Sequence, residues 1–224
     1  MIIEFTGVPG AGKSSIISQL SKAKLDTSLV VNIEKYVRSV SLLNIPTKLG
    51  YDIMLFLRFY KLTRLDFEVL FSAICHLDFK LSSLSTSLNI CRNICKKLII
   101  HRVIQAEDKV FLIDEGLSHI PMSLFVDVNK KVVKSDVVNL CKILPKVDRV
   151  ILIDAKDDEL LKRVLNRGIV GHRRMDFSTV SSVKLFMFKS REVVEILKEQ
   201  INPEIYMNNT KTITLKNIIK LISN

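Results

Sequence analysis

The chain has 224 residues, of which 48% are hydrophobic and 25% are charged. This length suffices for one α/β domain with a buried core and is too short for two well-buried domains, and the composition excludes a disordered chain. The formal net charge of +11 is spread along the chain and favours an anionic partner, whether a phosphorylated small molecule, nucleic acid or a membrane surface, although a solvated basic surface accounts for it equally well.

The N-terminal half of the sequence predicts two strands, one helix and a helical insertion. Residues 1–6 form a short apolar run that ends in a Gly-rich turn, and residues 14–24 show helical spacing. A second strand is expected at 29–33. Residues 46–105 are poor in Gly and Pro, and their Leu, Ile and Phe residues recur three and four positions apart, so this segment predicts an insertion of two to four helices.

The C-terminal half predicts alternating strands and helices. Short β-branched runs predict strands at 110–113 and 150–153 and a weaker one at 204–207. Such runs suit a parallel sheet that is buried on both faces. The expected helices occupy residues 130–144, 157–167, 181–200 and a final stretch from 215. We therefore predict a single α/β domain over residues 1–224, with a five-stranded parallel sheet flanked by helices.

Cysteine spacing and hydropathy predict where the protein resides. The four cysteines form no C-x-x-C pair and no disulfide-dense pattern, and no signal peptide is apparent. The longest apolar stretches are interrupted by charged residues well before they reach the length of a membrane span. Reduced thiols, a cytoplasmic location and no membrane span are the expectations.

The strongest motif is GVPGAGKS at residues 7–14, which fits G-x-x-x-x-G-K-[ST] between an expected strand and an expected helix. In such a loop the glycines let backbone N–H groups face phosphates, and the helix N-terminus adds positive potential. Lys13 is expected to reach the β- and γ-phosphates, and Ser14 to ligate Mg²⁺. The predicted nucleotide-binding residues are Gly7, Pro9, Gly10, Ala11, Gly12, Lys13, Ser14 and Ser15.

A second motif, VFLIDEG at residues 110–116, delivers two carboxylates at the end of an apolar strand. Ligands of open parallel sheets bind at the carboxyl ends of the strands. Asp114 is expected to hold Mg²⁺, and Glu115 to accept a proton from an attacking hydroxyl group or water. The alternative is an ordinary strand end with a solvated acidic turn.

A third signal is an arginine pair on the helix expected at 157–167. Arg163 and Arg167 lie four residues apart and so share one helix face, and Arg173 and Arg174 follow. Phosphoryl transfer needs positive charge near the phosphates when the site closes. We therefore predict that residues 163–177 form a lid that carries this charge. The alternative is an exposed basic helix.

The chain resembles the nucleoside and nucleotide kinase branch of the P-loop NTPases, which includes thymidylate kinases and deoxynucleoside kinases. The resemblance lies in three segments that occur in this order: GVPGAGKS, LIDEG and LLKRVLNRG. The resemblance implies a three-layer P-loop kinase fold that uses ATP and Mg²⁺. It also implies that Arg163, Arg167 and Arg173 act in the lid, and that the insertion at 46–105 forms the acceptor-binding side.

The resemblance has two departures. Thymidylate kinases carry Asp-Arg-Tyr, and deoxynucleoside kinases Glu-Arg-Ser, where this chain has Asp114-Glu115-Gly116, so the arginine beside the acceptor is missing and their substrates do not carry over. Deoxynucleoside kinases also place a catalytic Glu at the end of the second strand, where this chain has Glu34. Glu34 and Glu115 are therefore both candidates for the general base.

The leading hypothesis is ATP- and Mg²⁺-dependent phosphoryl transfer to a small hydroxyl or anionic acceptor. One alternative is a P-loop ATPase or regulatory switch, because the Asp114-Glu115 pair resembles the carboxylates that polarise water in motor proteins. The other is nucleic-acid binding or a 5′-end nucleic-acid kinase, which the net charge of +11 motivates. It is not favoured, because the sequence has no zinc finger, no RNP string and no Trp. The sequence leaves open the choice between ATP and GTP and between a monomer and a homodimer.

Overall fold

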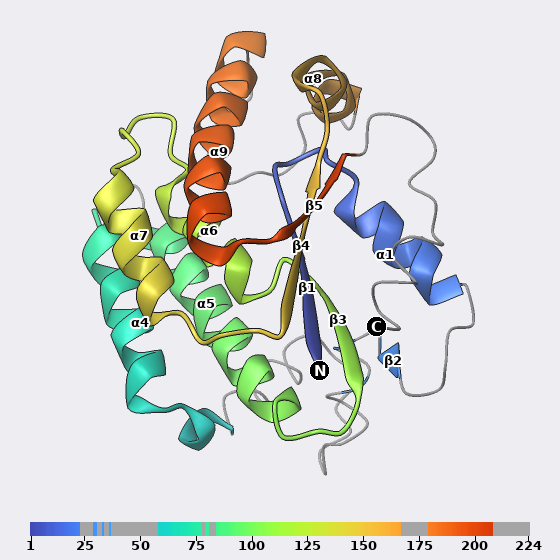
Figure 1. Cartoon of the computed structure of the whole chain (residues 1–224). Coiled ribbons are helices and arrows are strands. Elements are labelled where there is room, and N and C mark those ends of the chain that lie inside the picture. Colours follow the sequence, from blue (N-terminus) through green and yellow to red (C-terminus); the bar gives the residue numbers. More distant parts are fainter. Residues whose placement is uncertain are drawn as a thin grey trace.

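The computed structural model describes residues 1–22, 29–30, 33, 36, 58–77, 79–80, 84–166 and 179–207. Its centre is a five-stranded sheet with the order β2-β3-β1-β4-β5, and every paired strand is parallel (Figure 1). The strands are β1 (Ile2–Thr6), β2 (Leu29–Val30), β3 (Val110–Asp114), β4 (Arg149–Asp154) and β5 (Glu204–Met207). The five strands and their parallel pairing confirm the predicted sheet.

Helices cover both faces of this sheet. Figure 1 shows α1 (Lys13–Lys22) on one side and a group of helices together on the other side. That group consists of α4 (Arg64–His76), α5 (Leu84–Ile104), α6 (Ile120–Phe125), α7 (Lys134–Ile143) and α9 (Val180–Ile201). A short helix, α8 (Asp157–Asn166), follows β4 at one end of the sheet. Among these described helices, none combines the length and the apolarity that crossing a bilayer requires.

The central strands are largely buried because helices cover both faces of the sheet. All five residues of β1 are buried, and β4 is buried from Val150 to Asp154. Phe5, Phe111 and Leu112 have no exposed surface. Continuous burial of this kind is typical of a parallel sheet between two helical layers.

The segment after β3 departs from the prediction. A 3₁₀ turn, η2 (Leu117–His119), runs directly into α6, where the sequence predicted no element. Leu117, Ile120 and Leu124 are buried in this segment. It is too short for a helical period to be legible, so packing against the sheet and α5 determines its structure instead.

Two helices of the predicted insertion, α4 and α5, fall within the described residues, as does the short 3₁₀ turn η1 (Phe59–Lys61). The predicted helix at 130–144 begins later than expected, with Val133 as the N-cap of α7. The final helix expected from residue 215 lies outside the described residues.

A buried ion pair joins α4 to α5. Asp66, which has no exposed surface, accepts hydrogen bonds from Arg102 Nε at 2.8 Å and from Arg102 Nη2 at 3.0 Å. The same carboxylate accepts from the backbone N–H of Thr63 at 2.7 Å and closes the capping box of α4. Burial raises the pKa of Asp66, but the hydrogen bonds from Arg102 and Thr63 outweigh it and leave the pKa below its ordinary value.

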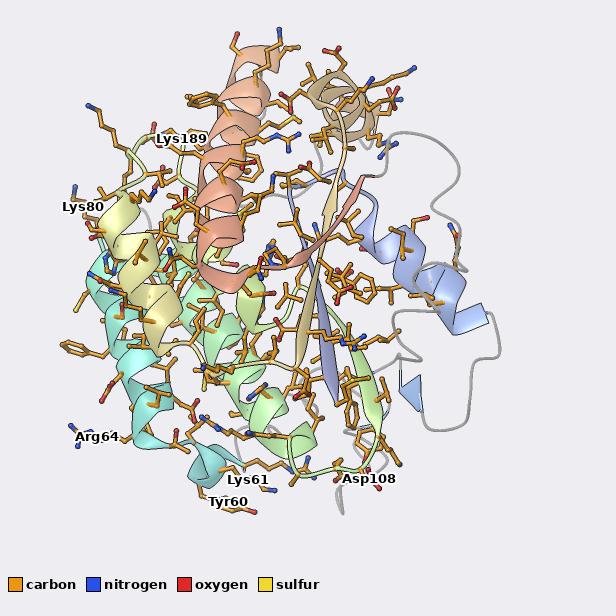
Figure 2. The ribbon with its side chains drawn as sticks, viewed as in Figure 1. Tyr60, Lys61, Arg64, Lys80, Asp108 and Lys189 are labelled. Carbon is orange, nitrogen blue, oxygen red and sulfur yellow. The ribbon has the colours of Figure 1, made fainter. Side chains whose placement is uncertain are left out.

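We expect Asp66→Ala to lower the free energy of unfolding by about 3 kcal/mol or more, because Arg102 would remain largely buried without its partner. Urea denaturation followed by circular dichroism measures this change. The matched control is Glu68→Ala on the same helix. Its partner, Arg64, is 95% exposed and projects away from the molecule (Figure 2), so the control should change stability by no more than about 0.5 kcal/mol. Equal losses in the two variants would contradict a structural role for the Asp66–Arg102 pair.

Candidate nucleotide-binding site

The loop between β1 and α1 adopts a backbone conformation that requires glycine. Gly7 has φ 139° and Gly10 has φ 85°. A Cβ atom on Gly7 would lie 2.1 Å from the carbonyl oxygen of Ile153 in β4, and one on Gly10 would lie 3.0 Å from Cγ2 of Val164 in α8. The two glycines therefore let the loop pass directly against β4 and α8, as a phosphate-binding loop at the carboxyl edge of a sheet requires.

Lys13, the lysine of this loop, is folded back over its own backbone. Its side chain is only 6% exposed, and its Nζ donates to the carbonyl oxygens of Gly7 at 3.0 Å and Val8 at 3.3 Å. The same nitrogen forms an ion pair with Glu115 Oε1 at 3.2 Å. The ammonium group is thus held where a triphosphate would approach, and protein oxygens accept its hydrogen bonds.

Ser14 and Asp114 meet where α1 begins and β3 ends. Ser14 Oγ donates a 2.7 Å hydrogen bond to Asp114 Oδ2, across 100 positions of sequence. Burial raises the pKa of Asp114, and the hydrogen bond from Ser14 opposes that shift. A hydroxyl and a carboxylate supply the hard oxygen donors that Mg²⁺ prefers, so the chemistry of this donor pair fits the predicted ion.

Glu115 lies beside this donor pair in an unusual backbone conformation. Its φ of 55° is in the left-handed region, which residues other than glycine rarely adopt, and its side chain is 46% exposed. Burial raises the pKa of its carboxyl group. Electrostatic attraction to protonated His119, to Lys13 and to Lys97 lowers the pKa by more, so it falls to about 2. The carboxylate is therefore ionised at neutral pH.

Two residues of the site were missed by the sequence predictions. His119 Nε2 lies 3.6 Å from Glu115 Oε2, and burial lowers the pKa of His119 to about 3, which leaves the imidazole neutral at pH 7. Lys97 faces the same group of charges from α5; burial lowers its pKa, while attraction to Glu115, Glu4 and Asp114 opposes that shift. Helical spacing places Lys97 on the face of buried Ile90 and Ile94, which is the sequence signal that could have found it.

Glu4 is the third residue that the sequence predictions missed. Its side chain, only 1% exposed within β1, accepts hydrogen bonds from the backbone N–H groups of Leu117 and Ser118, both at 2.7 Å. A Cβ atom on Gly116 would lie 2.1 Å from Glu4 Oε1. Glu4 thus fixes the turn that follows Glu115. Its sequence signal is a single charged residue within an otherwise apolar strand.

The arginine helix α8 lies against the loop, since Val164 is next to Gly10. Arg191 of α9 positions the start of α8: its Nη1 donates to both carboxylate oxygens of Asp154 at 2.5 and 2.6 Å, and its Nη2 donates to Asp157 at 2.7 Å. Arg163 is 29% exposed and lies 3.7 Å from Glu159, one turn away on the same helix.

The structure therefore brings the loop residues, Asp114 and Glu115 together and places the helix of Arg163 beside them. Pro9 and Ala11 lie in the loop, and Ser15 is exposed in the first turn of α1, where its hydroxyl accepts from Gln19 at 3.4 Å. The other predicted lid arginines and the second candidate base lie outside the described residues; these are Arg167, Arg173, Arg174 and Glu34.

No protein-family model and no curated protein matches this sequence. Among solved structures, the chain is similar to a deoxyadenosine kinase from M. mycoides with bound dATP; the alignment covers 100% of this chain and 98% of that chain, with a TM-score of 0.51 and 15% identity. That similarity confirms the coarser part of the predicted fold class, an α/β fold, which the chain shares with this deoxyadenosine kinase.

Two further solved structures overlap less well, and nothing further rests on them. One is deoxyadenosine kinase from M. mycoides with products dCMP and a flexible dCDP bound, at TM-score 0.44 and 18% identity over 100% of this chain and 97% of that chain. The other is thymidylate kinase from Ehrlichia chaffeensis, at TM-score 0.43 and 17% identity over 99% of this chain and 98% of that chain.

We expect Gly116→Ala to lower the free energy of unfolding by about 1–3 kcal/mol, because the added methyl group would overlap the hydrogen-bonded carboxylate of Glu4. In a Glu4→Ala background the overlap no longer exists, so the same substitution should cost much less. Urea denaturation of the four proteins of this cycle measures the difference. An equal cost of Gly116→Ala in both backgrounds would rule out the contact as its cause.

Proposed function

We propose that the protein catalyses ATP- and Mg²⁺-dependent phosphoryl transfer to a small-molecule acceptor, in the manner of nucleoside and nucleotide kinases. The observation that carries the proposal is the 2.7 Å contact between Ser14 and Asp114, next to the ammonium group of Lys13. The fold shared with a deoxyadenosine kinase structure that holds dATP supports a nucleotide at this loop.

In this proposal the residues of the loop and the residues at the end of β3 have different roles. The loop backbone and Lys13 bind the phosphates, and Ser14 and Asp114 hold the metal ion. Mg²⁺, when bound, supplies charge that neutralises the phosphate oxygens. Preorganised positive groups in a partly dry site stabilise the charge that develops during transfer, which is the largest catalytic contribution in reactions of this type.

Glu115 is the candidate proton acceptor for the attacking hydroxyl group. Its carboxylate is ionised, partly exposed and adjacent to Asp114, so it faces the region where an acceptor would meet the phosphates. Arg163, with Arg167 and Arg173, is proposed to supply the positive charge of the lid, because α8 begins the arginine segment beside the loop.

A labelled-phosphate assay tests the reaction class. Protein, Mg²⁺ and γ-labelled ATP are incubated with a panel of deoxynucleosides, nucleoside monophosphates, sugar alcohols and a 5′-hydroxyl oligonucleotide. We expect label on at least one small acceptor and none when EDTA removes the metal. Label released only to water would overturn the kinase proposal in favour of an ATPase, and label only on the oligonucleotide would favour a 5′-end nucleic-acid kinase.

We expect Lys13→Met to lower kcat/KM for the labelled acceptor by a factor of about 10²–10³, because it removes the positive charge closest to the phosphates. The control is Lys134→Met, in which the lost partner is Glu199 and both side chains are more than half exposed. This control should keep wild-type kinetics, and both variants should keep the wild-type circular dichroism spectrum. Comparable turnover by Lys13→Met and the control would contradict the role proposed for Lys13.

A further inference from the structure

A cavity of about 360 Å³ lies between the C-terminal ends of α7 and α9, on the face of the sheet opposite α1 (Figure 1). Three buried residues form its floor: Leu117 and Ser118 of η2, and Val150 at the start of β4. The volume falls within the range of about 300–1,000 Å³ that is usual for small-molecule sites.

This cavity is separate from the candidate nucleotide site. Val150 lies near the amino end of β4, whereas the P-loop passes against Ile153 near the carboxyl end. Residues three positions apart in a strand are separated by about 10 Å. Among the described residues that line the cavity there is no residue of the loop, and neither Asp114 nor Glu115. A molecule in the cavity therefore would not take the place of the phosphates.

The walls of the cavity are mainly apolar. Leu144, Val147 and Ile201 line it and are half-buried. Cys141 adds a thiol group, and burial raises the pKa of this thiol to about 11, so it is neutral at pH 7. Such walls favour an apolar group, because they remove its surface from water without leaving a charge unpaired.

The opening of the cavity carries positive charge. Lys142, Lys146 and Gln200 line it and are exposed. Within the described part of the chain neither lysine has an ion-pair partner, and no Asp or Glu is among the lining residues. The two ammonium groups are therefore available to an anionic group at the opening.

Ser118 gives the floor a polar group. Its backbone N–H donates to Glu4 at 2.7 Å, but its hydroxyl group has no hydrogen-bond partner among the described residues, although Ser118 is only 4% exposed. Buried hydroxyl groups normally have a partner, because the loss of hydration is otherwise uncompensated. Since Ser118 lines the cavity, a polar atom of a bound molecule would supply that partner.

We propose that this cavity is a second ligand site, which takes a small molecule with an apolar body and one acidic group, such as an aromatic carboxylate. The apolar body lies against Leu144, Val147 and Ile201, and Lys142 and Lys146 hold the acidic group at the opening. The volume is too small for a phospholipid. This inference does not depend on nucleotide binding at the P-loop.

A matched pair of fluorescent probes tests the ligand class. Anilinonaphthalene sulfonate carries an acidic group on an apolar body, and phenylnaphthylamine is the same body without that group. We expect Lys142→Met/Lys146→Met to raise the Kd of the sulfonate about fivefold, a modest factor because both lysines are exposed, and to leave the Kd of phenylnaphthylamine within about twofold. Val147→Trp fills the cavity and should raise the Kd of both probes at least about tenfold.

The charge-matched control is Lys61→Met/Lys184→Met. Both lysines are exposed and neither lines the cavity, and Lys61 lies at the lower edge of the molecule in Figure 2. This variant should bind both probes as the wild type does. Urea denaturation of each variant establishes that it is folded at the temperature of the titration.

Cysteine protection locates the bound probe in the wild-type protein. Cys141 lines the cavity, whereas Cys75 is exposed on α4 and serves as the internal control. Mass spectrometry follows the alkylation of each thiol by N-ethylmaleimide. Saturating sulfonate probe should slow the modification of Cys141 at least about fivefold, because a filled cavity excludes the reagent. It should leave the rate at Cys75 unchanged.

Four results would overturn the proposal. These are no saturable binding of the sulfonate probe, an affinity that Val147→Trp leaves unchanged, equal effects of the lysine variant on both probes, and no protection of Cys141. Displacement of the probe by Mg·ATP would also contradict a separate site. Selective loss of sulfonate affinity together with protection of Cys141 supports the proposal, whether or not the protein proves to be a kinase.

Discussion

The candidate site depends on the parallel register between β1 and β3. That register places Asp114 beside Phe5, so the loop that follows β1 and the carboxylates that follow β3 leave the sheet at the same edge. Ser14 and Asp114, far apart in sequence, can therefore meet at 2.7 Å. A register shift of one residue would turn the Asp114 side chain to the other face of the sheet and remove the only carboxylate that contacts Ser14 among the described residues.

Around that edge, three carboxylates are stabilised by three different kinds of donor. Backbone N–H groups hold Glu4, a hydroxyl group holds Asp114, and an ammonium group holds Glu115. Under the proposed function, only the last two lie where a nucleotide and its metal ion would bind. The Glu4 arrangement is structural, because its buried carboxylate holds the turn after Glu115.

The sequence predicted most of the fold, because short β-branched runs, helical periodicity and the GVPGAGKS string are local signals. The strand bounds of β5 were predicted exactly as the structure has them, and α8 and α9 to within one residue at each end. It did not predict η2 or α6, where a short apolar segment carries no legible period. Glu4, Lys97 and His119 were missed as site residues for another reason: their roles arise from tertiary packing, which brings three separate elements around Glu115.

The contact between Glu4 and Gly116 has a consequence for how this site could diverge. Because the Glu4 carboxylate occupies the space of a Cβ atom at position 116, a side chain there requires the carboxylate to move and to disturb its hydrogen bonds with Leu117 and Ser118. The thymidylate and deoxynucleoside kinases that the motif resembles carry Tyr or Ser at that place. An evolutionary route between the two arrangements therefore costs less stability when the residue on β1 changes first. Such epistasis would leave paired substitutions at the two positions in homologous chains.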